Sequence, residues 1–421
     1  MTEILDIPQM MQELGFDAKR ASRILAIAST EKKNEVLLRI ADKLSSSQSK
    51  ILAENAKDIE AGEKKGLGNA SLDRLALNTS RLSQISIGLN DIAKLDDPIG
   101  SIISEWERPN GLLIQQKRVP LGVVGVIFES RPNVTADAGA LCMKAGNAAI
   151  LRCGSESFNS SHAIHCCMVE GLVESGLPAS CIQLVPTRDR NAVGEMLNMI
   201  DIIDVIVPRG GKSLVERVTK DSKVPLFKHL EGICHTYIEG SANPLMAEEV
   251  IFNAKMRRPG ICGATETILV DNIVIQRILP AIISRLIDAG CEVRGDESVQ
   301  KVDVRVTPAS ESDWKAEYLE PIISIRAVKG IEQAIEHIER FGSSHTDAII
   351  TENEELAETF LNAVDSAIVM VNTSTQFADG AEFGMGAEIG ISTGKLHARG
   401  PVGVDQLTSI KYVVRGSGQC R

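Results

Sequence analysis

The first hundred residues alternate apolar and polar positions with the period of an α-helix. The spacing i, i+3, i+4, i+7, which gathers apolar side chains on one helical face, is seen at Leu37, Ile40, Ala41 and Leu44. Ser29 and Thr30 precede this run, and either hydroxyl suits an N-cap position. The pattern therefore predicts that this part of the chain is helical.

From residue 119 onward, short apolar segments alternate with amphipathic stretches. The segments have the length of buried strands and lie at 122–128, 148–151, 182–185, 204–207 and 236–238. A second series follows Cys262, at 266–270, 322–325, 348–351 and 368–371, with a helix expected at 331–341. Strands that alternate with helices predict parallel sheets covered on both faces. The fold class expected is therefore α/β, with two α/β units in tandem.

The end of the chain has a different pattern. Glycine is frequent from residue 379 to residue 403, and a strand-like segment follows at 410–414. Neither a long helix nor a buried strand fits the glycine-rich part. We expect this part to form loops.

The composition is ordinary for a globular protein and excludes several classes of function. Of 421 residues, 43% are hydrophobic and 24% are charged, so nothing indicates disorder. The formal net charge of −11 and a pI near 5.3 argue against a nucleic-acid-binding surface. The first thirty residues lack a signal-peptide pattern, and no apolar run is long enough to cross a bilayer. We therefore expect a cytoplasmic protein.

Cys262 is the cysteine that the pattern sets apart. A helical run at 247–256 ends before Arg257 and Arg258, and the next strand begins at Glu266, so Cys262 is the one cysteine that we place in a loop. The arginines and the small residues around it favour a thiolate and leave room for attack on a carbonyl group. A buried packing role is the alternative, because free cysteine is among the most buried residue types. No base is evident beside Cys262 in the sequence.

Several motifs that would indicate other chemistry are absent. Gly211-Lys212-Ser213 resembles the end of a phosphate-binding P-loop, but Ile206 stands where that loop needs a glycine. The glycines at 384–390 miss the dinucleotide-binding G-x-G-x-x-G spacing by one residue. The nine cysteines and seven histidines show no metal-ligand spacing, and no cysteines stand in a C-x-x-C pair. We therefore predict neither a metal site nor a disulfide framework.

Longer stretches resemble one known superfamily. Residues 120–127 (PLGVVGVI) and 144–152 (KAGNAAILR) are similar to the cofactor-domain signature of the aldehyde dehydrogenases. Further stretches resemble the gamma-glutamyl phosphate reductase family, also called glutamate-5-semialdehyde dehydrogenases, within that superfamily. They are 128–133 (FESRPN), 208–212 (PRGGK), 258–262 (RPGIC), 342–347 (GSSHTD) and the run from 377 to 401. They occur in the expected order over nearly the whole chain.

This resemblance implies a reaction in proline biosynthesis. Cys262 would attack the acyl phosphate carbon of L-glutamyl 5-phosphate and expel phosphate, and the resulting thioester would take a hydride from NADPH to give L-glutamate 5-semialdehyde. In relatives that oxidise aldehydes, a glutamate that precedes the cysteine in the sequence activates the water that hydrolyses the thioester. On the simplest alignment His229 occupies that place here, and Glu231 lies two positions beyond it. This departure fits a thioester that is reduced rather than hydrolysed. Glu231 as a capping or ion-pairing residue remains an equal alternative.

The resemblance also implies a set of cofactor-binding residues. Arg152 would meet the 2′-phosphate of NADP. Ser155 stands at the position where NAD-preferring relatives commonly place an acid, and Glu156 is next to it. Arg152 as a plain surface residue, and the glycines of 208–211 as a simple turn, remain alternatives. The expected cofactor-binding residues are Arg152, Ser155, Pro208, Arg209, Gly210, Gly211 and Glu317, the last at the nicotinamide ribose.

Substrate recognition is the least specific part of the resemblance. Carboxylates and phosphate call for arginine side chains or backbone amides. Candidate substrate-binding residues are Arg258, His345, Asn372, Asp379 and Arg399. His345 as a core histidine is the alternative for that residue. Gln376 stands where many relatives carry arginine.

The resemblance further implies a domain plan and an assembly. The expected parts are an NADP-binding domain (1–101 and 120–228), a catalytic domain (229–371), an oligomerisation arm (102–119 and 400–421) and a glycine-rich active-site segment (372–399). The arm would form a homodimer or a dimer of dimers, and glutamate 5-kinase is a candidate partner. Two other functions stay open, namely aldehyde oxidation with NAD(P) and a catalytically silent NADP-binding protein.

Overall fold

The computed structural model describes residues 6–421, which divide into two compact units. Unit 1 extends to Lys228 and takes up Gly384–Gly390 and Val402–Arg421 again, whereas unit 2 comprises His229–Phe383 and Ile391–Pro401. The break after Lys228 lies where the sequence places the start of the catalytic domain. The segment expected as one piece at 372–399 is divided between the units.

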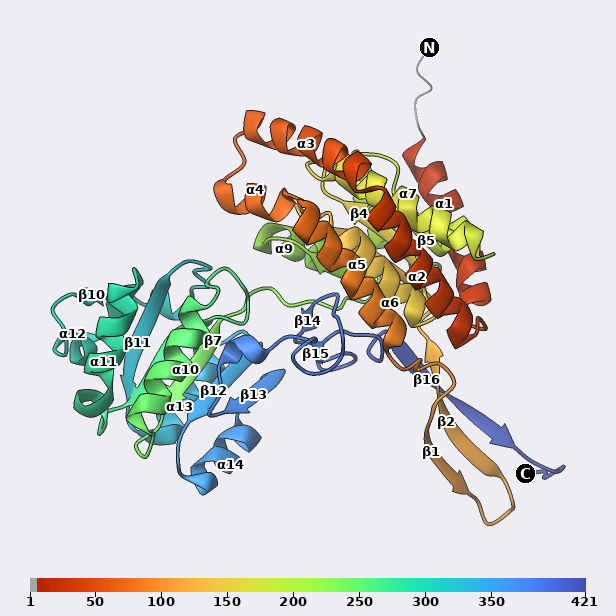
Figure 1. The fold of residues 1–421 in the computed structure, drawn as a ribbon. Coiled ribbons are helices and arrows are strands. Elements are labelled where there is room, and N and C mark those ends of the chain that lie inside the picture. The colour runs from red at the N-terminus through yellow and green to blue at the C-terminus, as the bar shows by residue number, and fades with distance from the viewer. Residues whose placement is uncertain (1–5) are drawn as a thin grey trace. The chain divides into compact units, whose positions relative to one another are not determined.

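Unit 1 is rich in helices (Figure 1). They are α1 (Ile7–Leu25), α2 (Thr30–Ser46), α3 (Gln48–Lys64), α4 (Asn69–Leu75), α5 (Thr79–Lys94), α6 (Val134–Lys144), α7 (Phe158–Glu174), α8 (Asn191–Asn198) and α9 (Lys212–Asp221). The predicted apolar face of α2 is buried, and the side chain of Ser29 caps this helix by accepting a hydrogen bond from the Lys32 amide. Helix α2 packs against α5 and α7.

The sheet of unit 1 has four parallel strands in the order β5-β4-β3-β6. They are β5 (Ile182–Leu184), β4 (Ala148–Cys153), β3 (Val123–Phe128) and β6 (Val205–Arg209). Every residue of β3 and β4 is buried, as expected for central strands of a covered parallel sheet. The strands end at one edge, and ligands of open α/β sheets bind outside that edge.

Unit 1 also carries an antiparallel arm (Figure 1). It consists of β1 (Ile102–Glu107), β2 (Leu113–Pro120) and β16 (Thr408–Arg415), with β2 in the middle. The predicted strand at 410–414 lies inside β16. Apolar side chains of the arm remain exposed, among them Ile102, Trp106, Ile410, Tyr412 and Val414.

Unit 2 is built on a parallel sheet in the order β10-β9-β11-β8-β7-β12-β13. Its strands are β7 (Cys234–Ile238), β8 (Thr265–Asp271), β9 (Glu292–Gly295), β10 (Thr307–Pro308), β11 (Ile322–Val328), β12 (Thr346–Ile350) and β13 (Ile368–Val371). The strand expected at 236–238 was placed last in the first series, and this is wrong. It is β7, which pairs with β8 and β12 at the centre of the second sheet.

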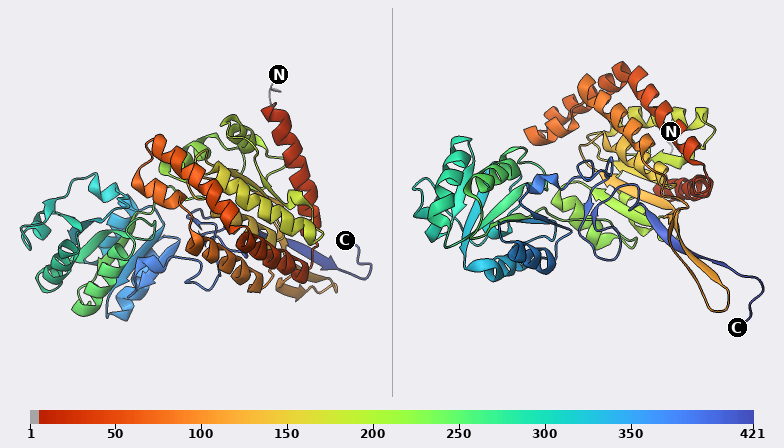
Figure 2. Two further views of the ribbon diagram at one scale, coloured as in Figure 1. Left: turned by 45° about the horizontal axis from the view of Figure 1, so that its top comes forward. Right: turned by 60° about the horizontal axis from the view of Figure 1, so that its bottom comes forward.

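Helices cover both faces of this second sheet. They are α10 (Pro244–Met256), α11 (Ile275–Asp288), α12 (Glu297–Gln300), α13 (Gly330–Phe341) and α14 (Glu354–Ala363). Ile238 and Ile268 join the core beneath α10 and α11, whereas the alternate residues Tyr237 and Leu269 join the core beneath α13 and α14. The right-hand view of Figure 2 shows the two layers, green and blue, on opposite sides of the sheet. A short pair, β14 (Ile391–Ser392) and β15 (Gly400–Pro401), also belongs to unit 2.

No helix among residues 6–421 combines the length and the apolar character needed to span a membrane.

Candidate active site

Cys262 lies in the loop between α10 and β8, as the sequence predicts. Asn243 caps α10 by accepting hydrogen bonds from the Leu245 and Met246 amides at 3.0 and 3.1 Å. The helix ends at Met256, and the thiol-bearing loop closes with a turn in which the Ala264 amide bonds the Ile261 carbonyl. Cys262 is half-buried, so the thiol is not sealed in the core.

Cys262 is not the only cysteine outside the helices and strands, contrary to the sequence-based expectation. Cys291 directly precedes β9, and Cys420 follows β16. Cys291 is nevertheless buried, and burial raises its pKa to about 11. Cys420 is exposed near the end of the chain. Only Cys262 combines partial exposure with a loop at the carboxyl side of α10.

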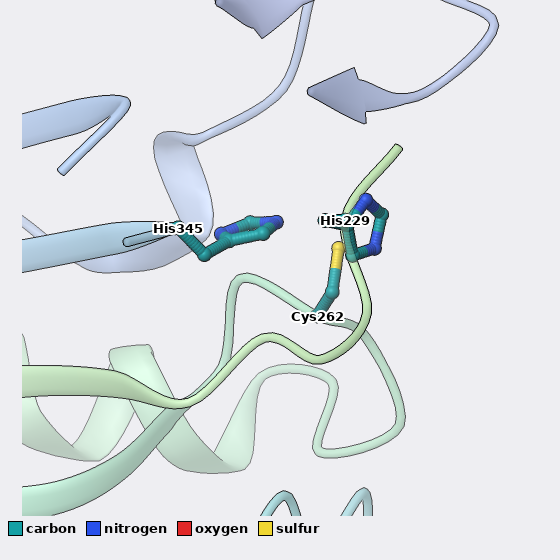
Figure 3. A group of neighbouring side chains, drawn as sticks. All are labelled: His229, Cys262 and His345. Carbon is teal, nitrogen blue, oxygen red and sulfur yellow. The ribbon is translucent and has the colours of Figure 1, made fainter. Parts of the chain in front are cut away.

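Two histidines lie beside the Cys262 thiol (Figure 3). The Cys262 sulfur and one ring nitrogen each of His229 and His345 all lie within 4.8 Å of one another. The two imidazole rings are 5.1 Å apart, centre to centre, and nearly perpendicular. The expectation that no base stands beside Cys262 is therefore wrong. Sequence spacing gave no signal of this cluster, because the three residues lie in three different loops that are far apart in the sequence.

The protonation of His229 is set by a backbone contact. Its Nδ1 lies 2.7 Å from the carbonyl oxygen of Ile391. A carbonyl only accepts hydrogen bonds, so Nδ1 carries the proton, and in the neutral ring Nε2 is an acceptor. His229 is thus held in the tautomer that can take a proton at Nε2.

His345 is fully buried at the start of β12. Its Nδ1 lies 2.9 Å from the Thr346 hydroxyl and 3.7 Å from the Cys234 sulfur. The preceding residue, Ser344, has a φ of 57°, a conformation that non-glycine residues rarely adopt outside functional or tightly constrained turns. The core location matches the alternative raised for His345, yet Figure 3 shows the ring pointing towards Cys262.

Gly232 fixes the position of Cys262. A Cβ atom at Gly232 would lie 2.1 Å from the Cys262 carbonyl oxygen and 2.7 Å from its Cα, so only glycine fits here. The Gly232 amide donates to Glu317 at 2.9 Å. Glu317, expected at the nicotinamide ribose, therefore also supports the segment that packs against the nucleophile.

Cys234 is a site residue to which the sequence gave no primary role. Its thiol donates to the Cys262 carbonyl oxygen at 3.1 Å. Burial raises the pKa of Cys234 well above its ordinary value, so this group remains a thiol and a donor. The adjacent Ile233 amide donates to the Ser343 hydroxyl at 2.9 Å, which ties the start of β7 to the residues before His345.

The remaining substrate-binding candidates have different surroundings. Arg258 is exposed. Arg399 forms an ion pair with Asp365 at 2.8 Å, and Asp379 accepts from the Ala381 amide at 2.9 Å. Asn372 bonds both the amide and the carbonyl of Thr351, at 2.9 and 2.8 Å. Local hydrogen bonds thus already involve Asn372 and Asp379.

Gln376 has a structural role in positioning the thiol loop. Its amide nitrogen donates to the Ala254 carbonyl at 2.9 Å, in the last turn of α10, where carbonyl groups lack helical partners. Its oxygen accepts from Arg257 at 3.3 Å. The glutamine thus holds the end of the helix that leads into the Cys262 loop.

The expected cofactor residues of unit 1 lie at the carboxyl edge of its sheet. Pro208 and Arg209 end β6, and Gly211 is the N-cap of α9. A Cβ at Gly210 would meet the Glu129 carboxylate at 2.5 Å, whereas one at Gly211 would meet nothing within 4 Å. A Cβ at Gly210 would therefore require the flexible Glu129 and Leu214 side chains to move. The Gly211 amide already donates to the Glu129 carboxylate at 3.1 Å, so an anionic ligand at the first turn of α9 would have to displace that carboxylate.

Arg152 ends near the same edge but is only 5% exposed. Its Nη2 donates to the backbone carbonyls of Arg188 and Asp189, at 3.3 and 3.5 Å. Its Nε is buried without a hydrogen-bond partner among the residues that the structure describes. Burial lowers the pKa of Arg152. Arg152 therefore supports the loop at 188–189 and is not a plain surface residue.

A cavity of about 170 Å³ lies beside this loop. Its lining includes Ser155, Glu156, Asn159, Arg188 and Lys65. Sequence reasoning missed Arg188 and Lys65, because they lie on a loop and a helix end that only the fold brings to Ser155. The lining also includes Asp58, so two basic and two acidic side chains face this cavity, and the basic pair supplies donors for a phosphate group.

Comparison with known proteins agrees with this architecture. The model of the aldehyde dehydrogenase family matches residues 11–308 and 302–413. A gamma-glutamyl phosphate reductase of Paramagnetospirillum magneticum is 59% identical over 99% of this chain and 98% of its own length. One from Rhodospirillum rubrum is 60% identical over 99% of this chain and 97% of its own length.

A solved structure is similar over nearly the whole chain. The gamma-glutamyl phosphate reductase of Thermotoga maritima has a TM-score of 0.95 at 40% identity, over 98% of this chain and 99% of that one. With the α/β units and the cysteine loop described above, these matches establish that the chain belongs to the aldehyde dehydrogenase family, in the branch whose members are named gamma-glutamyl phosphate reductase.

Proposed function

We propose that this protein reduces L-glutamyl 5-phosphate to L-glutamate 5-semialdehyde with release of phosphate, as a step of proline biosynthesis. The names of relatives at 59% and 60% identity over the full chain support this substrate. The observation that carries the chemistry is the half-buried Cys262 thiol beside the imidazoles of His229 and His345.

In this proposal His229 and His345 activate the Cys262 thiol. Neutral His229 accepts a proton at Nε2, and an imidazolium next to sulfur stabilises the thiolate. The thiolate attacks the acyl carbon, an S–C bond forms, and the C–O bond to phosphate breaks with its electron pair leaving on phosphate. In this proposal the protonated imidazole then neutralises charge on the leaving phosphate, or on the oxyanion that forms when hydride adds to the thioester.

The residues of unit 1 fit a nicotinamide cofactor. Arg188 and Lys65 line the cavity beside Ser155, and a cofactor phosphate at the N-terminus of α9 would replace the Glu129 carboxylate that now accepts from the Gly211 amide. When bound, the cofactor supplies the hydride that reduces the thioester. The two basic side chains, and Ser155 in place of an acid, favour NADP over NAD.

Aldehyde oxidation is the second candidate. It needs a base that activates water against the thioester, and the structure places two histidines, not Glu231, in the cluster with Cys262. His229 is aligned with the water-activating glutamate of the aldehyde oxidases and could itself act as a base towards water. The two reactions are therefore distinguished by whether turnover depends on phosphate.

The test is an assay in the reverse direction, with L-glutamate 5-semialdehyde and NADP, in which NADPH formation is followed by absorbance. The proposed reaction requires phosphate, because phosphate cleaves the thioester. Formation of NADPH at the same rate without phosphate would instead show aldehyde oxidation. No turnover under either condition would support the silent alternative.

The same assay tests the role of Cys262 when this residue is replaced. Cys262→Ala should lower phosphate-dependent turnover by several orders of magnitude, because the thioester cannot form. NADPH affinity, measured by fluorescence titration, should stay near that of the unchanged protein, because the proposed cofactor residues lie mainly in unit 1. Cys420→Ala, which alters an exposed cysteine, is the control and should keep full turnover. Substantial turnover in Cys262→Ala would rule out covalent catalysis by this residue.

A further inference from the structure

We propose that Cys262, His229 and His345 form a binding site for Zn²⁺, and that the bound ion reversibly blocks the thiol. Binding of the metal stands on geometry alone, whereas the block of turnover rests on the function proposed above. Zinc is an added ligand in this proposal and takes no part in the reaction.

The ligand atoms already lie close to a metal-binding arrangement. Zn²⁺ binds sulfur at about 2.3 Å and imidazole nitrogen at about 2.0–2.1 Å, so tetrahedral ligand atoms stand roughly 3.5 Å apart. The three atoms here lie within 4.8 Å of one another, so bringing them onto an ion needs each separation to shorten by no more than about 1.3 Å. Cys262 and His229 are only half-buried. Rotation of the Cys262 side chain, together with small shifts of the rings that keep their Nδ1 contacts, can supply this movement.

The two histidines are oriented as metal ligands usually are. Such histidines donate the second ring N–H to a carbonyl or another acceptor, which fixes the ring and its tautomer. His229 makes this bond from Nδ1 to the Ile391 carbonyl at 2.7 Å. His345 has the Thr346 hydroxyl 2.9 Å from its Nδ1. Both rings are therefore held before any ion arrives.

The donor set selects the class of ion. One thiolate and two imidazoles suit zinc and exclude Mg²⁺ and Ca²⁺, which require oxygen ligands. Three protein ligands leave a fourth position for water. Cys234 does not fill that position, because its thiol already donates to the Cys262 carbonyl.

Metal binding has a direct chemical consequence for Cys262. The thiol loses its proton to solvent, and a sulfur lone pair forms the Zn–S bond. This lone pair is no longer available to attack a carbonyl carbon. Zn²⁺ should therefore lower turnover, and a chelator should restore it.

The experiment uses Co²⁺ as a spectroscopic probe on the full chain. A second cysteine–histidine pair, Cys166 and His162 at 3.3 Å, lies on the surface of α7 and offers a competing weak site. All measurements therefore use the Cys166→Ala/Cys420→Ala background, first freed of metal. We expect one Co²⁺ per chain, with a thiolate-to-cobalt charge-transfer band that Zn²⁺ abolishes and that is absent in Cys262→Ala.

Histidine variants test the other two ligands. His229→Ala and His345→Ala should each weaken Zn²⁺ affinity at least tenfold, measured by competition with a chromophoric chelator. His229→Gln and His345→Gln serve in case the alanine variants unfold. A charge-transfer band that persists in Cys262→Ala, or an affinity unchanged in every histidine variant, would overturn the proposed site.

The readouts separate this proposal from the proposed function. Cobalt binding with the expected band, in a protein without phosphate-dependent turnover, would leave the metal site standing and remove the function. Full turnover without metal binding to Cys262 would remove the metal site alone. Inhibition by Zn²⁺ that persists unchanged in the His229→Gln and His345→Gln variants would contradict a block through these ligands.

Discussion

Gly232 is the residue whose replacement should displace Cys262 most directly. A methyl group at this position would overlap the Cys262 carbonyl oxygen and Cα, which are backbone atoms and cannot rotate away. We expect Gly232→Ala to shift the thiol by about 1 Å and to lower turnover on the order of a hundredfold. The same assay with phosphate, semialdehyde and NADP measures this.

Gly260→Ala is the matched control for that prediction. Gly260 lies in the same loop, but a Cβ there would meet only the Leu319 carbonyl oxygen, at 3.6 Å. Its turnover should remain within about twofold of the unchanged protein. Equal losses in both variants would indicate that the loop tolerates no added atom, and would remove the special role of Gly232.

The sequence predicts the nucleophile better than its neighbours. Cys262 follows from a local pattern, a helix that ends and a strand that begins within a few residues. His229 was aligned with a water-activating glutamate but had no predicted contact, and His345 was expected in the substrate site. Their meeting depends on the order β8-β7-β12 in the second sheet, because His229 precedes β7 and His345 precedes β12. Strand order of this kind cannot be read from hydrophobic periodicity.

At the scale of elements, the loop after β5 should decide cofactor choice. Arg188 lines the cavity beside Ser155, whereas Arg152 bonds the carbonyls of that loop. One lost charge-assisted contact costs roughly 1.5–3 kcal/mol, so Arg188→Ala should raise the KM for NADPH about tenfold or more and spare that for NADH. Arg152→Ala should raise both values, because it loosens the loop.

Steady-state kinetics with each cofactor test these expectations. A selective loss of NADPH use in Arg152→Ala would instead assign the 2′-phosphate to Arg152, as the resemblance implies. Unchanged kinetics in Arg188→Ala would remove that residue from cofactor recognition.

His337, in helix α13, should make the folding stability of unit 2 fall at acidic pH. Burial, together with the nearby charges of His235, Arg326 and Arg340, lowers the pKa of His337 to about 2. The unfolded side chain titrates near pH 6.5, so below that pH the unfolded chain binds a proton that the folded chain does not. The stability contribution is complete above about pH 6.5 and declines as the pH falls, by up to about 1.4 kcal/mol per pH unit.

A variant of His337 can isolate this contribution. His337→Gln keeps an acceptor for Arg326, whose guanidinium lies 2.8 Å from Nδ1, but it cannot take up a proton. The free energy of unfolding from urea denaturation should therefore fall less steeply between pH 6.5 and pH 4.5. His162→Gln, at an exposed position on α7, is the control. Parallel pH profiles for the His337 variant and the unchanged protein would contradict the prediction.

Most strands were predicted to within a few residues, because buried parallel strands are continuous apolar runs. The exceptions are informative. Strand β9 was missed because Glu292 and Arg294 alternate with a single valine and a glycine, and β10 because it has two exposed residues. Strand β7 was predicted but assigned to the first series, because hydrophobic periodicity indicates that a segment is a strand but not which strands it pairs with.

At the scale of the whole molecule, the exposed arm predicts association. Ile410, Tyr412 and Val414 alternate on one face of β16 and are 50%, 63% and 55% exposed, which a lone chain in water does not favour. Strand β16 also forms an edge of its sheet, and pairing across a two-fold axis would cover it. We expect a homodimer or a dimer of dimers.

Deleting the residues after Thr408 should therefore give monomers with lower activity, as measured by light scattering and by the reductase assay. A milder variant, Ile410→Lys/Val414→Lys, keeps the strand and adds charge to its apolar face. It should shift the same equilibrium without removing backbone. A fully active monomer, or an unchanged assembly in both variants, would contradict a role of the arm in association.

The pairing of β16 with β2 also governs when the arm can form. The contact between Gln116 and Tyr412 joins residues 296 positions apart in the chain. A ribosome adds residues one after another, so β2 is synthesised long before its partner strand exists. During that interval β2 has only β1 beside it. The association that we expect through the arm would therefore be open only to chains that have been synthesised as far as β16.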